Sequence, residues 1–201
     1  MTASKSQQRF KTFAACLGLA LLLFLFQHGY SASAAQQPPT VANNTITIYD
    51  DQFGTNWSTS LWGDGFIDAS ATNPVFSGQH ALQIRLDDPR LTALRILTSE
   101  NLDPNGYQSV SFYIYGTEAG QTVNFEAWDS VSITLESQTI NLPTNEWMRV
   151  EMPLNQLETE WELQAFVFRN ASSATPFYID QIELTPKAPI GANKIYLPFI
   201  Q

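Results

Sequence analysis

The sequence predicts an all-β fold, a two-sheet antiparallel β-sandwich (jelly roll) of about ten strands within residues 45–185. Three observations predict it. Apolar residues recur at every second position in many short segments, turn-forming residues separate those segments, and no segment keeps an apolar period of about 3.6 residues. A two-sheet sandwich lets strands of this kind bury one face each.

The alternating segments supply most of the expected strands. Strict alternation over five or more residues is typical of a strand with one buried and one wetter face. Residues 154–157 instead favour a single helical turn. The alternation covers residues 45–49, 81–86, 109–114, 123–128, 131–135 and 148–152. The turn signals between the segments include Asn73-Pro74, Ser77-Gly78, Asp88-Pro89, Asp103-Pro104-Asn105-Gly106, Ala119-Gly120 and Leu142-Pro143.

Residues 1–35 have the pattern of a secretory signal peptide. A basic start precedes an apolar run at residues 13–26, and small residues at 31–35 follow it. We expect cleavage after Ala34 or Ala35 and a secreted, extracellular or cell-surface protein. The run is too short to span a bilayer about 30 Å thick, so no membrane span is expected after cleavage. A retained N-terminal anchor is the alternative.

Two short segments flank the expected sandwich. Residues 36–44 are polar and proline-bearing, which indicates a spacer. Residues 186–201 combine a second spacer with a short apolar C-terminal tail at 194–201. That tail predicts sorting or attachment to cell-surface components, and a last strand packing on the domain is the equal alternative.

Cysteine usage and charge narrow the chemistry. The single cysteine, Cys16, lies in the leader, so the mature chain has no disulfide, thiol catalysis or thiolate metal site. The formal net charge is −9, and loss of the three basic residues of the leader takes it to about −12. Such a field repels nucleic acid and anionic lipid. Neutral glycans, divalent cations and other proteins are the expected partners.

Several phrases together resemble jelly-roll domains of the galactose-binding-like and carbohydrate-binding-module type, found in secreted bacterial proteins. They occur in the order of that family and cover nearly all of residues 45–185. One position departs from the pattern, because relatives often carry a tryptophan near the position of Leu91. The phrases are residues 48–51, 76–82, 106–107 with 110–116, 146–147 with 153–154, and 177–184.

The resemblance implies a structural calcium ion, with Asp50 or Asp51 and Asp180 as the matching ligands. Calcium takes six to eight oxygen ligands, and the Ser77-Gly78 turn could add backbone carbonyls. The alternation also breaks at Asp180, which predicts a β-bulge there. The alternative is that Asp50 and Asp51 cap a strand exit while Asp180 accepts hydrogen bonds from loop amides.

Tryptophans mark the expected ligand face. Sugar binding needs flat aromatic rings with polar groups around them. Trp128 is out of phase with the core residues of its strand and therefore shares a face with Asn124 and Glu126. Trp57 and Trp62 fall in residues 51–65, which we expect to be a long binding loop. Alternatively, Trp128 packs under a loop, and Trp57 with Trp62 forms a small loop core.

These observations favour a secreted, non-catalytic module that binds neutral or weakly charged polysaccharide and carries a structural calcium ion. A structural or adhesive cell-surface protein, binding another protein or itself, is the alternative. A small secreted hydrolase or lyase is a distant third. It would need a cleft with converging carboxylates or with His80, and the chain has no Gly-x-Ser-x-Gly elbow, so no catalytic residue is predicted.

Overall fold

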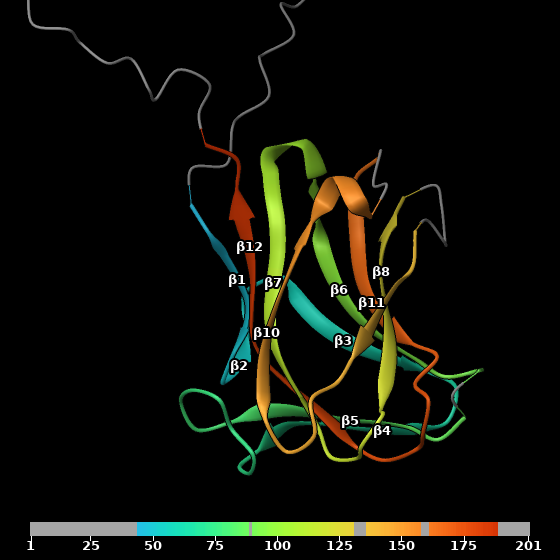
Figure 1. Ribbon diagram of the computed structural model, residues 1–201. Coiled ribbons are helices and arrows are strands. Elements are labelled where there is room, and N and C mark those ends of the chain that lie inside the picture. Colours follow the sequence, from blue (N-terminus) through green and yellow to red (C-terminus); the bar gives the residue numbers. More distant parts are fainter. Residues whose placement is uncertain (1–43, 89, 131–135, 158–160, 189–201) are drawn as a thin grey trace, which may run out of the picture. The chain divides into compact units, whose positions relative to one another are not determined.

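The computed structural model describes residues 44–88, 90–130, 136–157 and 161–188. These residues form twelve strands and two 3-10 turns (Figure 1). The predicted all-β antiparallel sandwich is confirmed. The leader, most of the first spacer, the expected strand at 131–135 and the C-terminal tail lie outside the described residues.

A seven-stranded sheet forms one layer of the sandwich (Figure 1). Its main path places the first and last described strands, β1 and β12, side by side. Strand β5 pairs with the start of β12, and β4 pairs with β5. The path runs β10 (Trp147–Pro153), β7 (Tyr107–Gly116), β12 (Phe177–Pro186), β1 (Ile46–Asp50) and β2 (Gln52–Phe53), with β5 (Ala81–Leu86) and β4 (Gly65–Ala71) beside it.

A five-stranded sheet forms the other layer. Every neighbouring pair in it is antiparallel. Its order is β3 (Trp57–Trp62), β6 (Ala93–Leu102), β11 (Leu163–Arg169), β8 (Thr122–Asp129) and β9 (Gln138–Asn141).

Aromatic side chains from both sheets fill the core. The ring centroid of Phe112 on β7 lies 5.1 Å from that of Phe125 on β8 and 5.3 Å from that of Phe168 on β11. Burial of each such ring stabilises the fold by about 1.5–3 kcal/mol. The inward residues of β5, β7 and β8 are those that the alternation predicts, whereas on β1 a register shift before Tyr49 lets this residue join the core beside Ile48. Most of the hydrophobic stabilisation therefore lies between the sheets.

Strands β6 and β11 of the five-stranded sheet carry buried apolar residues on both faces. Their inward residues join the main core, whereas Ala93, Ala165 and Val167 form a second apolar cluster. Leu97 and Trp128 pack against this cluster. Because neighbouring side chains of a strand point to opposite faces, the second cluster lies on the outer face of the sheet.

Residues 51–65 correct one expectation, because they form β2 and β3 instead of a long loop. Strand β3 pairs with β6 along its whole length. Trp57 on this strand faces the core, is 8% exposed and stacks on Phe166 at a centroid distance of 6.3 Å. The serine- and threonine-rich composition suggests a loop, but pairing with β6 satisfies the backbone and makes a strand.

The helical content of the described residues is limited to two short turns. The turn expected at residues 154–157 is confirmed as η2 (Leu154–Gln156). The other, η1 (Pro104–Gly106), is capped by Asp103, whose carboxylate accepts a hydrogen bond from the Asn105 backbone N–H at 2.8 Å. No helix within the described segments has the length and apolar character needed to cross a membrane.

Candidate functional site

Antiparallel register brings the predicted polar and aromatic residues onto one surface. Trp62 lies opposite Ala93, Ala93 opposite Arg169, and Arg169 opposite Asn124, so one row of outward side chains crosses four strands. Trp128 is four residues from Asn124 on β8 and shares its face. We call this outer surface of the five-stranded sheet the tryptophan face.

Two indole rings meet on the tryptophan face. The ring centroids of Trp62 and Trp128 are 6.4 Å apart, and the rings are nearly perpendicular at 82°. Their strands, β3 and β8, are separated by β6 and β11, so the two side chains lean toward each other across the outer surface of these strands. The small side chains beneath them, Ala93 and Ala165, leave room for this arrangement. Trp62 stays 57% exposed and Trp128 is half-buried.

Glu126 supports the tryptophan face from below. Its side chain is fully buried, and both carboxylate oxygens are used. Oε1 accepts a hydrogen bond from Arg169 Nε at 2.6 Å, and Oε2 accepts one from Trp128 Nε1 at 3.0 Å. Glu126 was expected beside a ligand. Its burial instead gives it a positioning role, because it fixes the orientation of Trp128 and Arg169.

Asn124 lies at the opposite end of the row from Trp62. Its Oδ1 accepts a hydrogen bond at 3.0 Å from the hydroxyl of Thr139 on β9. The amide is half-buried, so this bond holds it at the margin of the face beside the edge strand.

A hollow of about 440 Å³ opens between the two rings and the turn that precedes β6. This volume lies within the range of small-ligand sites, about 300–1,000 Å³. Leu91 projects at its rim and is 73% exposed. The lining residues are Trp62, Gly63, Arg90, Leu91, Thr92, Ala93, Trp128 and Arg169.

Close packing of two turns fixes the rim of the hollow. The Thr92 hydroxyl donates to the Asp64 carbonyl at 2.8 Å, which ties the turn before β6 to the turn after β3. Gly63 has a φ of +83°, and a Cβ there would lie 2.7 Å from the Leu91 carbonyl oxygen. Only glycine tolerates both the left-handed backbone and this close approach.

Sequence reasoning missed the arginines of this region. Arg95 is the next outward residue after Ala93 on β6, and its Nη2 donates to Ser60 Oγ at 2.9 Å. The Nε of Arg95 is buried and has no hydrogen-bond partner. Arg90 and Arg169 line the hollow. A usable signal was present, because Arg95 and Arg169 stand at outward positions of otherwise apolar strands.

Two of the aspartates predicted to bind calcium, Asp51 and Asp180, clamp the 76–80 loop. Asp180 Oδ2 accepts hydrogen bonds from the backbone N–H groups of Phe76 at 3.0 Å and Ser77 at 3.2 Å. Asp51 Oδ1 accepts from Gln79 at 2.6 Å and His80 at 2.8 Å. Acceptance of hydrogen bonds from loop amides is the alternative role considered for Asp180, whereas the alternative for Asp51 was a cap at a strand exit.

The β-bulge predicted at Asp180 is confirmed. The pairing of β12 with β7 shifts register between Asp180 and Glu183, and Gln181 has a φ of 47°. The bulge aims the Asp180 carboxylate at the loop, where its side chain is fully buried. Gly78 completes the fit, because its φ is +69° and a Cβ there would collide with the Asp51 carboxylate.

Backbone amides and burial shift the pKa values of the two aspartates in opposite directions. The His80 and Gln79 amides hold the pKa of Asp51 below its usual value. Burial raises the pKa of Asp180 despite its three amide donors, the third being Gln181 N–H.

Few side-chain oxygens in the described residues could serve as ligands for a cation. No group of three or more His, Cys, Asp or Glu side chains that could hold a metal ion occurs in the described parts of the chain. The exposed Asp50 carboxylate and Asp51 Oδ2 make no hydrogen bond there, so backbone carbonyls would have to complete a calcium shell.

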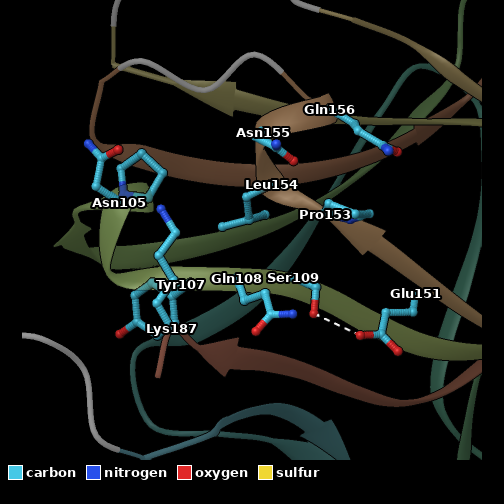
Figure 2. Close-up of a pocket in the computed structure, with 11 residues that line it drawn as sticks. Asn105, Tyr107, Gln108, Ser109, Glu151, Pro153, Leu154, Asn155, Gln156 and Lys187 are labelled. Atoms are coloured by element: carbon cyan, nitrogen blue, oxygen red, sulfur yellow. Dashed lines mark hydrogen bonds between the residues drawn. The ribbon is translucent and has the colours of Figure 1, made fainter. Parts of the chain in front are cut away.

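A second hollow of about 450 Å³ lies on the seven-stranded sheet near η1 and η2 (Figure 2). Glu151 is the one carboxylate among its lining residues, and Figure 2 shows it bonded to Ser109, with Lys187 across the hollow. Hydrogen bonds from Arg149 and Ser109 lower the pKa of Glu151. A glycosidase needs two carboxylates, one with a raised pKa, so this hollow lacks the geometry of that reaction.

Comparison with solved structures identifies the fold. No protein-family model and no curated protein matches the chain. A variant of a family 29 carbohydrate-binding module in complex with mannohexaose is 13% identical, with a TM-score of 0.52 over 70% of this chain and 90% of that one. Another variant of that family, in complex with cellulohexaose, is 13% identical, with a TM-score of 0.51 over 70% and 89%.

A family 11 carbohydrate-binding module from Clostridium thermocellum, in complex with a β-1,3-1,4-mixed-linked tetrasaccharide, has the same architecture. It is 12% identical, with a TM-score of 0.50 over 71% of this chain and 95% of that one. The chain therefore has a β-sandwich of the carbohydrate-binding-module type.

Proposed function

We propose that this protein is a secreted, non-catalytic module that binds neutral or weakly charged polysaccharide on the tryptophan face. The observation that carries the proposal is the pair of indole rings of Trp62 and Trp128, which meet at 6.4 Å beside an open hollow. Exposed rings of this kind suit the apolar face of a pyranose. Binding of a sugar on such rings requires no catalytic residue.

Polar groups around the rings supply the other half of sugar recognition. Arg169 lines the same hollow, and Asn124 stands in the same row. Guanidinium and amide groups donate hydrogen bonds to sugar hydroxyls and fix the orientation of a ring stacked on tryptophan. Solved complexes of structurally similar modules contain oligosaccharides, which supports this class of ligand.

Retention on immobilised polysaccharides tests the proposal. We expect a mannan, a mixed-linked glucan or another glycan of a broad panel to retain the protein. Trp62→Ala and Trp128→Ala should each weaken retention about tenfold, which corresponds to about 1.4 kcal/mol. Phe66→Ala is the matched control, because Phe66 is an exposed aromatic residue on β4 of the other sheet. Absence of retention on every glycan by folded protein would reject the proposal.

A structural or adhesive role is supported by a different surface. The ring of Phe76, 40% exposed, stacks on Tyr113 at 3.5 Å and contacts Trp147 at 6.0 Å on the outer side of the seven-stranded sheet. Such an apolar cluster could dock a protein partner or a second copy. Concentration-dependent association, lost in Phe76→Ser and present without glycan binding, would favour this role.

Secretion rests on the sequence of residues 1–35. The sandwich strands begin at Ile46, so removal of the leader takes no described strand away. N-terminal sequencing of exported protein should find Ala35 or Gln36 as the first residue. A product that still begins near Met1 would indicate a retained anchor. Attachment to the cell surface through residues 194–201 can be tested in the same cells by deleting that segment.

A structural calcium ion is part of the proposal. Asp51 lies beside the 76–80 loop, Asp50 precedes it in the chain, and the backbone carbonyls of the loop are further hard oxygen donors. An ion that binds only the folded chain raises its melting temperature. We expect calcium to raise the melting temperature, a chelator to reverse it, and Asp50→Asn with Asp51→Asn to abolish the effect. An unchanged melting temperature would show that the amide clamps suffice.

A further inference from the structure

Positive charge gathers on the tryptophan face of an acidic chain. The formal net charge is −9, yet three of the six basic residues that the structure describes lie on or beside this face. The other sheet pairs its arginines locally, Arg85 with Asp87 and Arg149 with Glu151, each at 2.6 Å. The three basic residues of the face are Arg90, Arg95 and Arg169.

Two of these arginines make no ion pair with the described residues. Arg169 is neutralised by the buried Glu126. The Arg90 backbone N–H donates to Asp88, but its guanidinium forms no ion pair. Arg95 bonds only the neutral hydroxyl of Ser60. An anionic ligand would therefore find two uncompensated guanidinium groups here.

Arg95 also carries an unsatisfied donor. Its buried Nε has no partner, and a buried polar group without one costs about 1–3 kcal/mol. Arg95 follows Ala93 by two residues on β6, which places it about 7 Å along the strand from the floor of the hollow. A ligand carboxylate beside Arg95 would not reach this buried Nε, but it would gain a charge-assisted hydrogen bond from the guanidinium nitrogens that are not buried.

We infer that the tryptophan face selects a polysaccharide in which uronate units are interspersed among neutral sugar units. This inference rests on the proposed function and names its ligand more closely. Neutral pyranose rings lie on Trp62 and Trp128, and a carboxylate accepts hydrogen bonds from Arg95 or Arg90. The planar fork of a guanidinium matches a carboxylate in geometry and charge.

Sparse charge on the ligand follows from the charge of the whole chain. A densely charged polyanion would run beyond the arginines and meet the acidic remainder of the molecule. Screening over about 8 Å at physiological salt confines the attraction to the face itself. A glycan with occasional carboxylates gains the local attraction and avoids most of the repulsion.

The test uses the full-length chain and one polymer in two chemical states. The probe is glucuronoxylan, and its control is the same polymer after its carboxyl groups are reduced to alcohols. Neutral mannan, mixed-linked glucan and a sulfated glucan complete the set. The variants are Arg90→Gln and Arg95→Gln, with Arg149→Gln as a cation control on the opposite sheet. Because Arg90 is exposed, its variant leaves the core untouched even where Arg95→Gln weakens folding.

We expect glucuronoxylan to bind at least about tenfold more tightly than its reduced form, and this preference to shrink with added salt. Each face variant should lose about tenfold on glucuronoxylan and little on the reduced polymer, whereas Arg149→Gln should lose nothing. Equal binding of both forms, or retention only on neutral or sulfated glycans, overturns the inference and leaves glycan binding intact. Retention on no polymer at all overturns the proposed function itself.

Discussion

At the scale of the residue, Glu126 shows how a buried carboxylate can shape a surface that it does not reach. One side chain on β8 accepts hydrogen bonds from Trp128 on its own strand and Arg169 on the next. Because both oxygens are occupied and the side chain is fully buried, its effect on a ligand passes through these two neighbours.

Replacement of Glu126 should damage both stability and the tryptophan face. Glu126→Gln keeps the size but turns one acceptor into a donor, so either Arg169 or Trp128 loses its partner. We expect a loss of about 1–3 kcal/mol in the free energy of unfolding. Glu136 is an exposed carboxylate two residues before β9, so Glu136→Ala should change the free energy of unfolding by less than about 0.5 kcal/mol. Urea denaturation monitored by tryptophan fluorescence measures both; equal effects would contradict the assigned role.

Sequence reasoning placed a tryptophan correctly where the alternation of faces along its strand was used. Trp128 is out of phase with Phe125 and Ala127, and it lies on the outer face as predicted. Trp57 and Trp62 were placed together in a loop, yet they lie five positions apart on one strand. An odd separation puts them on opposite faces, so Trp57 is buried and Trp62 exposed. The alternation of Trp57, Thr59 and Leu61 was the available signal.

At the scale of the element, the strands that sequence reasoning identified most clearly are those whose outer face carries mostly polar residues, even where these are buried. Strands β7 and β8 alternate because polar residues separate their core residues. Strands β6 and β11 carry apolar residues on both faces and therefore show no period of two. The indole ring of Trp128 packs against their outer apolar residues, a contact that depends on strand order and is invisible in the sequence.

The small residue at position 93 of β6 keeps the hollow open. Ala93 lies between Trp62 and Arg169 and is 5% exposed at the floor. Ala93→Leu should occupy this space, push Trp62 away and weaken glycan retention at least about tenfold. Removing no hydrogen bond and no aromatic ring, it should leave the melting temperature within a few degrees. Ala69→Leu on β4 is the control. Full retention by folded Ala93→Leu would place the ligand elsewhere.

At the scale of the whole molecule, acid stability depends on carboxylates whose pKa values move in opposite directions. Hydrogen bonds lower the pKa values of Asp51, Asp68 and Glu151, so the stability they contribute is present above their unfolded pKa and lost as the pH falls through the folded pKa. Burial raises the pKa of Asp180, so its contribution is greatest below its unfolded pKa and is lost as the pH rises.

The two aspartates that clamp the 76–80 loop should therefore respond oppositely to acid. Between about pH 7 and pH 3 the wild-type free energy of unfolding falls, because groups with lowered pKa values outnumber Asp180. Asp51→Asn removes one of those groups and should make the fall shallower. Asp180→Asn removes the opposing group and should make it steeper, even though the variant is already less stable at pH 7. Urea denaturation across this range measures how the free energy of unfolding changes with pH. If both variants made the fall shallower, or both made it steeper, burial would not be the dominant influence on the pKa of Asp180.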